Sequence, residues 1–426
     1  MYNNFRNKKG ITLVILIITI LIMLILAGVA ISAVKGDNGI LKKSKVVIDK
    51  QNYRDIYEKV QTAVTEAFGT TGELNTKFLE SNLKKIKGFN EIEGISNGAV
   101  SSWPIKVIVD NYTFEIDEEG ELSEGTIYLD KDLILYSDLG QPIVVKNGSN
   151  VNIDLNGKKV NTTKDAIVVE EGANLTITGS GKIESSNGAI VNLGGTVVVE
   201  SGEFKSSSWY AIKNLGNMTI NGGTIEQADN NPNESSLIAN GWYYGNSTKP
   251  KNVDRNILPP DISTKEAKAI LTINGGTFIH YLETSTIKSD DWSKTIINNG
   301  EFIGNNGIFV QATGEVIING GSCIGYRDLG SFFADGSLGY EPGIMTITNG
   351  KFEAKSLIIP GTNNIGTLNI TGGTFNNINE IKDTRRSKYS YINNVNGGTY
   401  NIDVKNELPD GYTTKADGSN FVVVKQ

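Results

Sequence analysis

The feature that most constrains this fold is a glycine placed two residues before a large apolar residue, a motif that occurs nine times between residues 181 and 398. Most copies read Gly-Gly-Thr-Phe or a close variant of it. Neighbouring copies lie 21 to 29 residues apart, except for one gap of 53 residues between Ile225 and Phe278. A repeat of this length predicts a solenoid, because each unit can bury its apolar face only against the next unit. The apolar members are Ile183, Phe204, Ile225, Phe278, Phe302, Cys323, Phe352, Phe375 and Tyr400.

Apolar residues two positions apart stand shortly before most of these motifs, and this alternation predicts β-strands. Each unit then reads as a strand, a glycine turn, a second strand and a further short strand, which fits one coil of a parallel β-helix. Glycine suits the turn because it adopts positive φ freely. Four asparagines, Asn221, Asn274, Asn319 and Asn396, stand directly before the glycine pairs, so we expect a ladder of stacked amides. The apolar pairs are Val197 and Val199, Met218 and Ile220, Leu271 and Ile273, Val316 and Ile318, Met345 and Ile347, and Leu368 and Ile370.

The composition agrees with an anchor joined to a solenoid. The chain has 426 residues, 48 of them glycine, and a formal net charge of −7. No basic stripe follows the repeats, so we expect no nucleic-acid partner. The single cysteine, Cys323, excludes an intramolecular disulfide and takes a position that Phe or Ile fills in other coils, so we expect a buried thiol. No Asp-x-Asp-x-Asp-Gly pattern is present, and we expect neither a metal nor a cofactor.

The N-terminal region predicts a membrane span. Arg6, Lys8 and Lys9 precede an uncharged run from Ile11 to Val34. As a helix this run would be about 36 Å long, enough to cross the roughly 30 Å hydrocarbon core of a bilayer. A secretory signal peptide has a shorter apolar region, so that alternative fits less well.

The residues from Lys8 to Val14, Lys-Lys-Gly-Ile-Thr-Leu-Val, resemble the class III leader of type IV pilins and pseudopilins. The resemblance implies that a prepilin peptidase cuts after Gly10 and that Ile11 becomes the methylated N-terminus. Pilins usually carry glutamate at the fifth mature position, where this chain has Ile15, and this departure favours a tethered monomer or a minor subunit. The stretches 26–30 and 36–41 resemble the leaders of many surface proteins of Gram-positive bacteria.

After the span, apolar residues recur every three or four positions from Tyr53 to Phe68 and predict an amphipathic helix. Residues 105–116 alternate on either side of Asp110-Asn111 and predict a β-hairpin. A long helix packed on a small hairpin is similar to a pilin head. The fold class that we expect is mostly β: a parallel β-helix solenoid with an N-terminal transmembrane and amphipathic helix and a small α+β pilin-like module. The expected boundaries are 1–10 for the leader, 11–34 for the transmembrane helix, 35–125 for the pilin-like module, 126–405 for the β-helix with an insertion at 226–268, and 406–426 for a C-terminal capping hairpin.

We expect a single-pass protein of the cell membrane with its β-helix on the cell surface. The basic residues on the two flanks of the span do not decide its orientation. Long domains cross the membrane largely regardless of flanking charge, and a β-helix behind a pilin-like leader is expected outside the cell.

The solenoid resembles the right-handed β-helices of the pectate lyase-like superfold, which includes pectin lyases, polygalacturonases and phage tail-spikes. Of the polygalacturonase motifs only the dipeptide Asp290-Asp291 is present, and we expect it in a solvated turn. His280 has no adjacent glycine, and neither Arg327-Asp328 nor Arg385-Arg386 lies beside a cluster of acidic residues of the kind that a lyase would need. We therefore expect no enzyme, although fold alone does not decide function. A polysaccharide lyase or glycoside hydrolase stays open as one alternative, and a minor pilin or pseudopilin subunit as another.

Aromatic residues around the insertion suggest a binding surface. If three groups on neighbouring coils share one face, their rings could stack on sugars. Their other interpretation is that they pack the insertion onto the solenoid. The function that we expect is an adhesin or display protein that binds a surface glycan or protein without chemistry. The candidate residues are Trp209, Tyr210, Trp242, Tyr243, Tyr244 and Trp292.

Overall fold

The computed structural model describes residues 46–48, 50–69, 72–123, 125–228, 235–242, 260, 266–310, 314–332, 343–359, 366–382 and 391–426. The expected leader and the apolar run 11–34 lie outside these residues. Among the helices in the described part of the chain, none combines the length and the apolar character needed to cross a bilayer.

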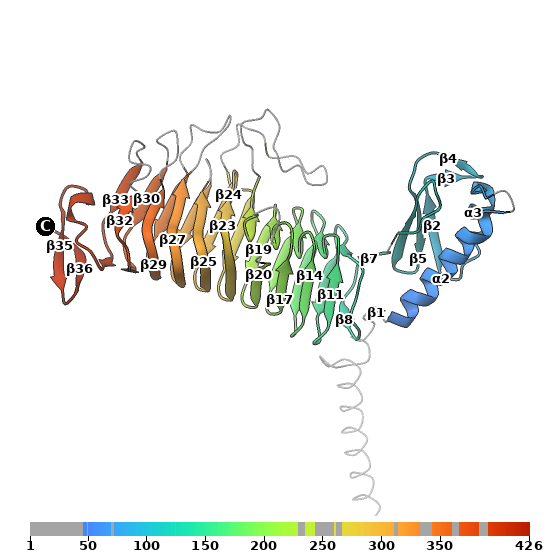
Figure 1. The fold of residues 1–426 in the computed structure, drawn as a ribbon, viewed down its shortest axis with the longest axis horizontal. Helices are drawn as coiled ribbons and strands as arrows, with labels where there is room; N and C mark the ends of the chain where they lie inside the picture. Colours follow the sequence, from blue (N-terminus) through green and yellow to red (C-terminus); the bar gives the residue numbers. More distant parts are fainter. Residues whose placement is uncertain are drawn as a thin grey trace, which may run out of the picture. The chain divides into compact units, whose positions relative to one another are not determined.

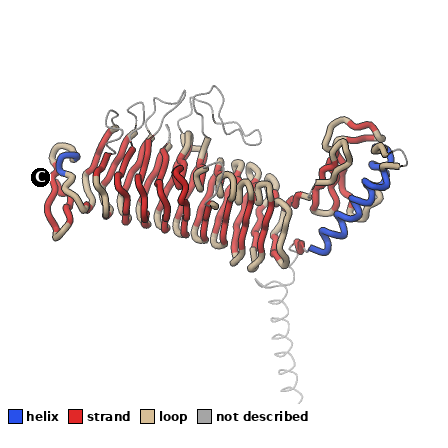
Figure 2. Tube along the Cα trace, viewed as in Figure 1, coloured by secondary structure: helices blue, strands red, loops and turns tan. Residues whose placement is uncertain are grey.

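The first part of the described chain packs a helix on a small antiparallel sheet (Figure 2). Ile56, Val60 and Val64 on one face of the long helix are buried. Tyr53 of this helix lies 5.4 Å, between ring centroids, from Tyr112 of the sheet. The strands pair in the order β2-β5-β6, and the turn between β5 and β6 follows Val109. The elements are β1 (Val46–Ile48), α2 (Lys50–Ala67), α3 (Thr76–Leu83), β2 (Phe89–Glu93), β3 (Ile95–Ser96), β4 (Ala99–Val100), β5 (Ile105–Val109) and β6 (Tyr112–Ile116).

The rest of the chain is a parallel β-solenoid, as the repeat predicted. Its strands lie side by side in sequence order from β8 to β33, green to red in Figure 1. One sheet contains one strand from each coil, each paired in parallel with the next. Its strands are β8 (Leu133–Leu135), β10 (Asn150–Asp154), β13 (Asn174–Thr178), β16 (Thr196–Val199), β19 (Asn217–Ile220), β22 (Ala269–Ile273), β24 (Ser293–Ile297), β26 (Glu315–Ile318), β28 (Ile344–Ile347), β30 (Thr367–Ile370) and β33 (Ile392–Val395).

The second sheet has two strand columns in its early coils; these merge in the coils of β23 to β29 and separate again after β29. Both β20 and β21 pair in parallel with the long strand β23, which therefore spans both columns. The first column contains β11 (Lys159–Thr162), β14 (Lys182–Ser185), β17 (Glu203–Ser206), β20 (Thr224–Gln227), β31 (Thr374–Asn376) and β34 (Thr399–Tyr400). The second contains β7 (Thr126–Leu129), β9 (Ile143–Val145), β12 (Ile167–Val169), β15 (Ile190–Asn192), β18 (Ile212–Asn214), β21 (Ile238–Asn240) and β32 (Glu380–Lys382). The merged strands are β23 (Thr277–Ser289), β25 (Glu301–Val310), β27 (Ser322–Phe332) and β29 (Lys351–Ile359).

The interior of the solenoid is formed by the residues that the repeat pointed to. All nine apolar members of the glycine motif are buried, and so are the six apolar pairs. Phe278 stacks on Phe302 with 4.5 Å between ring centroids, and Phe375 stacks on Tyr400 at 4.7 Å. Cys323 pairs in register with Phe302 on one side and Phe352 on the other. Cys323 is buried, so the expected buried thiol is confirmed, and this burial raises the pKa of the thiol to about 12.

The recurring glycine is required by the backbone. Gly223 has φ +94° and Gly276 has φ +101°. A Cβ added at Gly276 would come within 2.9 Å of the carbonyl oxygen of Gly223, one coil earlier. The same turn in successive coils therefore needs both the positive φ and the missing side chain.

Two asparagine ladders cross the coils. In the exposed ladder, Asn274 donates to Asn221 at 2.9 Å and Asn319 donates to Asn298 at 3.0 Å, with Asn298 donating to Asn274 at 2.8 Å. This confirms the predicted ladder for Asn221, Asn274 and Asn319, whereas the side chain of Asn396 does not join it in the described structure. A second ladder, which the sequence analysis missed, is fully buried and contains Asn192, Asn214 and Asn240, joined by Nδ2 to Oδ1 bonds of 2.8 Å each.

The C-terminal residues form a hairpin on the last coil. β35 (Tyr412–Asp417) and β36 (Asn420–Lys425) pair antiparallel, and β36 pairs antiparallel with β34. The 3-10 helix η4 (Lys405–Glu407) precedes the hairpin. The parallel stacking therefore stops at an antiparallel strand.

Candidate functional site

Trp209 and Tyr210 lie in the turn between β17 and β18. The Trp209 side chain is 48% exposed, and its ring lies 6.4 Å from the ring of Tyr210, measured between centroids. The backbone beneath them is held from inside the solenoid, because the carbonyl oxygen of Trp209 accepts hydrogen bonds from Ser206 Oγ at 2.8 Å and Gln227 Nε2 at 2.7 Å. Lys213 Nζ lies 5.7 Å from the centroid of the Tyr210 ring. This turn presents an exposed indole on a fixed backbone.

Trp242 and Trp292 occupy a different environment. Both are buried, and their rings meet edge to face with 6.5 Å between centroids. They belong to an apolar cluster with Leu193, Leu215 and Ala269. Buried in this way, neither indole has a free face for a sugar ring. Their packing matches the alternative interpretation, in which these rings belong to the core.

The expected aromatic platform therefore does not include Trp242 and Trp292, which are buried. Tyr243 and Tyr244 lie outside the described residues, and so do the leader residues Gly10 and Ile11. Of the candidate aromatic residues that the structure describes, Trp209 alone is more than one-third exposed.

Asp290 and Asp291 are buried, so the prediction of a solvated turn is wrong. The turn is pinned by backbone hydrogen bonds: Asp290 N donates to Asn240 O at 2.8 Å, and Asp291 N donates to Trp242 O at 3.0 Å. In return, Trp242 N donates to Asp291 O at 3.1 Å. Hydrophilicity suggested exposure, but this antiparallel bridge draws the dipeptide onto the solenoid beside the two indoles.

His280 is also buried, and its side chain points into the solenoid from β23. Its Nε2 lies 3.0 Å from the carbonyl oxygen of Ser235. Burial lowers the pKa of the imidazole below its ordinary value of 6.5, so His280 is neutral at physiological pH. Like Ser206 and Gln227, it holds a neighbouring turn through a backbone carbonyl.

Arg327 has two acidic partners, of which Asp328 is adjacent in the sequence and Glu283 is not. Its Nη1 lies 2.9 Å from Glu283 Oε2, and its Nε lies 3.2 Å from Asp328 Oδ2. Asp328 is buried and also accepts a hydrogen bond from Ser356 Oγ. Glu283 lies on β23, two coils before Arg327 on β27, so only the stacking of β23, β25 and β27 brings the two side chains together. Arg385 and Arg386 lie outside the described residues. Within the part of the chain that is described, no group of three or more His, Cys, Asp and Glu side chains could hold a metal ion.

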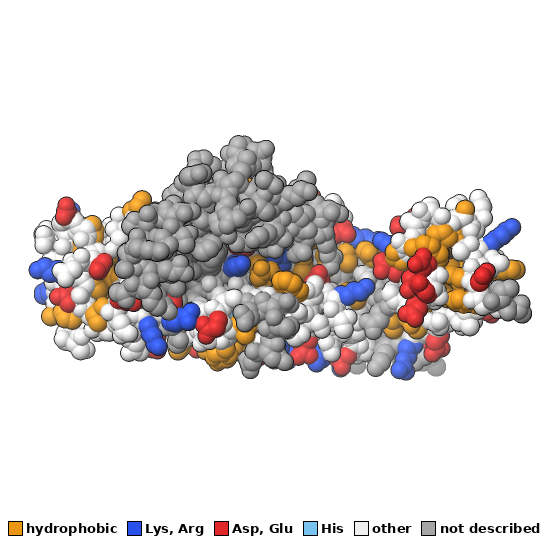
Figure 3. Space-filling view, turned by 45° about the horizontal axis from the view of Figure 1, so that its top comes forward, with side chains coloured by type: hydrophobic (Ala, Val, Ile, Leu, Met, Phe, Trp, Pro, Cys, Tyr) orange, Lys and Arg blue, Asp and Glu red, His pale blue; other side chains and the backbone are white. Residues whose placement is uncertain are grey.

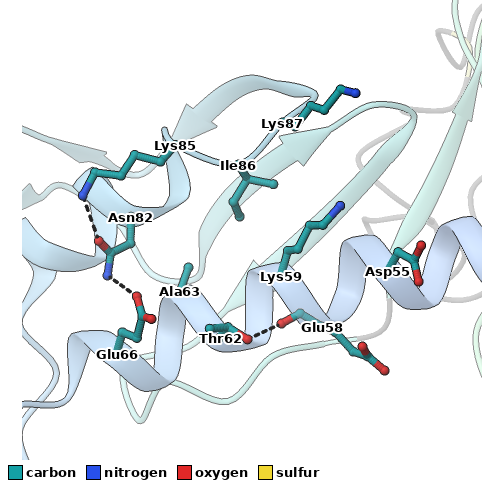
Figure 4. A pocket seen from close by; sticks show the side chains of 10 residues that line it. All are labelled: Asp55, Glu58, Lys59, Thr62, Ala63, Glu66, Asn82, Lys85, Ile86 and Lys87. Atoms are coloured by element: carbon teal, nitrogen blue, oxygen red, sulfur yellow. Dashed lines mark hydrogen bonds between the residues drawn. The ribbon is translucent and has the colours of Figure 1, made fainter.

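The helical part of the chain has an open groove of about 620 Å³ between α2 and the end of α3 (Figure 4). Asn82 bridges its two sides, donating to Glu66 Oε2 at 3.4 Å and accepting from Lys85 Nζ at 3.4 Å. Acidic and basic side chains both line it, among them Asp55, Glu58, Lys59 and Lys87. These long bonds and mixed charges describe a solvated surface rather than a selective site.

Charges of both signs are interspersed along the described surface on the face shown in Figure 3. On the solenoid, Lys205 pairs with Glu226 at 2.6 Å and Lys294 with Glu315 at 2.8 Å, each pair joining consecutive coils. In these described coils, each lysine therefore lies next to a carboxylate.

Comparison with protein-family models, with curated proteins and with solved structures finds no match. The resemblances to pilin leaders and to pectate lyase-like proteins therefore rest on the motifs given above.

Proposed function

We propose that this chain is a membrane-tethered surface protein whose β-helix binds a glycan or protein ligand without catalysis. The observation that carries the proposal is the exposed Trp209 on a backbone that Ser206 and Gln227 hold in place. An indole face stacks well on the apolar face of a sugar, and a fixed backbone reduces the entropy lost on binding.

The tether in this proposal is the apolar run 11–34, preceded by a leader that a prepilin peptidase cuts between Gly10 and Ile11. The solenoid would then stand on the outer surface of the cell membrane. Support comes from the leader motif and from the length of the uncharged run.

Two alternatives have one observation each in their favour. A polysaccharide lyase or hydrolase is supported by the cluster of Glu283, Arg327 and Asp328, although mutual pairing leaves these charges poorly suited to act as a base or acid. A minor pilin is supported by the packing of α2 on the antiparallel sheet, shown by the contact between Tyr53 and Tyr112.

The proposal is tested with the full chain in detergent on an array of surface polysaccharides, comparing wild type with Trp209→Ala. We expect the substitution to weaken binding about twofold to thirteenfold, since an aromatic stacking contact is worth roughly 0.5–1.5 kcal/mol. Tyr136→Ala is the matched control, because Tyr136 is 54% exposed on the first coil and should leave binding unchanged.

The same glycans are examined for shortened chains and unsaturated ends. Product formation would replace the binding proposal by the enzymatic one. Equal binding by wild type and Trp209→Ala would remove Trp209 from the site.

A further inference from the structure

A cavity of about 260 Å³ lies in the solenoid where β23, β25 and β27 stack. It is distinct from the turn of Trp209, which does not line it. Ser236 reaches it from just before β21, Thr284 from β23 and Asn306 from β25. Glu283, Arg327 and Asp328 also line it.

Three side-chain oxygens at this cavity are buried and have no hydrogen-bond partner: Ser236 Oγ, Thr284 Oγ1 and Asn306 Oδ1. Ser236 is 2% exposed and Asn306 is 7% exposed. The amide of Asn306 is oriented by Nδ2, which donates to the carbonyl oxygen of Glu283, so that Oδ1 is the atom left over. Buried polar atoms in folded proteins nearly always have a partner, and three unpaired oxygens at one cavity indicate a partner that is not part of the chain.

The chemistry of that partner can be inferred from which charged and polar groups at the cavity already have partners within the chain. Arg327 is held by Glu283 and Asp328, and Lys288 also lines the cavity, so two cations and two carboxylates balance there. The unmet groups are an amide oxygen, which needs a donor, and two hydroxyls, which donate and accept. Neutral hydroxyl groups on neighbouring carbons meet these needs, whereas a free anion or cation would disturb the arginine's ion pairs.

The volume of the cavity limits the size of the ligand. Pockets for drug-sized ligands span about 300–1,000 Å³, so this smaller cavity fits one sugar ring rather than an oligosaccharide. We propose that the cavity binds a single neutral sugar ring, whose hydroxyls bond to Ser236, Thr284 and Asn306. This inference rests on the proposed function for its ligand class and adds a second site with named contacts.

The test measures the melting temperature of the full chain in detergent with glucose, galactose, mannose or N-acetylglucosamine, and with glycerol as a small polyol. We expect at least one sugar to raise the melting temperature of the wild type, and glycerol to raise it less. Ser236→Ala and Thr284→Val should each remove most of that rise. Without sugar they should melt at or slightly above the wild-type temperature, because each removes an oxygen that has no partner in the free protein.

Ser185→Ala is the matched control. Ser185 is buried to a similar degree, but its Oγ donates to Lys164 O and accepts from Asn187 N. This variant should melt at a lower temperature without sugar and keep the full rise with it. The contrast separates an oxygen that binds ligand from one that holds the fold.

Three outcomes would overturn the inference: no sugar stabilises the wild type, glycerol stabilises it as much as any sugar, or Ser236→Ala and Thr284→Val lower the melting temperature without sugar as Ser185→Ala does. Trp209→Ala distinguishes this failure from failure of the proposed function. If array binding depends on Trp209 but no sugar raises the melting temperature, the cavity proposal fails and the surface-binding proposal stands; a sugar-induced rise without array binding gives the reverse result.

Discussion

At the scale of the residue, His280 is the single histidine of the chain and couples the fold to pH. Burial lowers its pKa below 6.5 in the folded state, so the unfolded chain binds this proton more readily. The stability that the neutral imidazole contributes is complete above about pH 6.5 and is lost as pH falls from there towards the folded-state pKa. Within that window each pH unit removes up to about 1.4 kcal/mol.

We therefore expect His280→Gln to flatten the dependence of the unfolding free energy on pH between about 7.5 and 5.5. Glutamine suits the position because Gln227 lies at the matching place one coil earlier, where its side chain bonds to a turn carbonyl. Urea unfolding at several pH values measures the slope. Equal slopes for both proteins would show that other groups cause the pH dependence.

Trp242 and Trp292 show the limit of reasoning from residue type. An aromatic residue in a polar stretch is equally compatible with a binding face and with packing. The indoles become core because the bridge between Trp242 and Asp291 places the two rings against each other.

At the scale of the element, the two asparagine ladders differ in burial and should differ in strength. The side chain of Asn214 is fully buried and makes bonds to Asn192, Asn240 and Gly216. Asn214→Ala leaves buried donors and acceptors without partners, and we expect a loss of about 2 to 3 kcal/mol in unfolding free energy.

Asn274→Ala is the comparison in the exposed ladder. Water replaces the lost partner of Asn221 and Asn298 there, so we expect a cost below about 1 kcal/mol. Urea unfolding of both variants gives the two values. Equal losses would contradict the assignment of stability to the buried ladder.

The short helix α3 was missed by the sequence analysis, although a signal for it exists. Asn75 accepts a hydrogen bond from Phe78 N at 3.1 Å as an N-cap, and Leu79 and Leu83 are buried one turn apart. An Asn followed by apolar residues four positions apart is a helix-start pattern. It is easy to overlook here because the helix has only eight residues.

At the scale of the whole molecule, the open end of the solenoid depends on the C-terminal hairpin. β36 pairs with β34 through Thr399 with Val422 and Tyr400 with Phe421. An uncovered strand edge above an aromatic stack is a template for association between chains. We expect deletion of residues 405–426 to produce oligomers or aggregates, measured by light scattering in the same detergent.

Lys415→Glu, on the exposed outer strand, is the control and should scatter light as the wild type does. A monodisperse deletion variant would show that the hairpin is not needed as a cap.

The sequence by itself determined the solenoid, its glycine turns, its buried apolar columns and most of the exposed asparagine ladder. It could do so because residues that contact each other in neighbouring coils are separated by a nearly constant number of residues, so that these contacts appear in the sequence as a repeat. What depended on the tertiary structure lies where this interval fails. The 53-residue gap interrupts the repeat, and residues within it pair with residues beyond it: Ile238 pairs with Ile287 and Trp242 bridges to Asp291. The spacing of the repeat does not predict either contact. The burial of Asp290 and Asp291 and the pairing of Arg327 with Glu283 arise in the same way, as does the cavity lined by Ser236, Thr284 and Asn306. Each joins residues that have no shared place in the repeat, and only stacking of the merged strands brings them together.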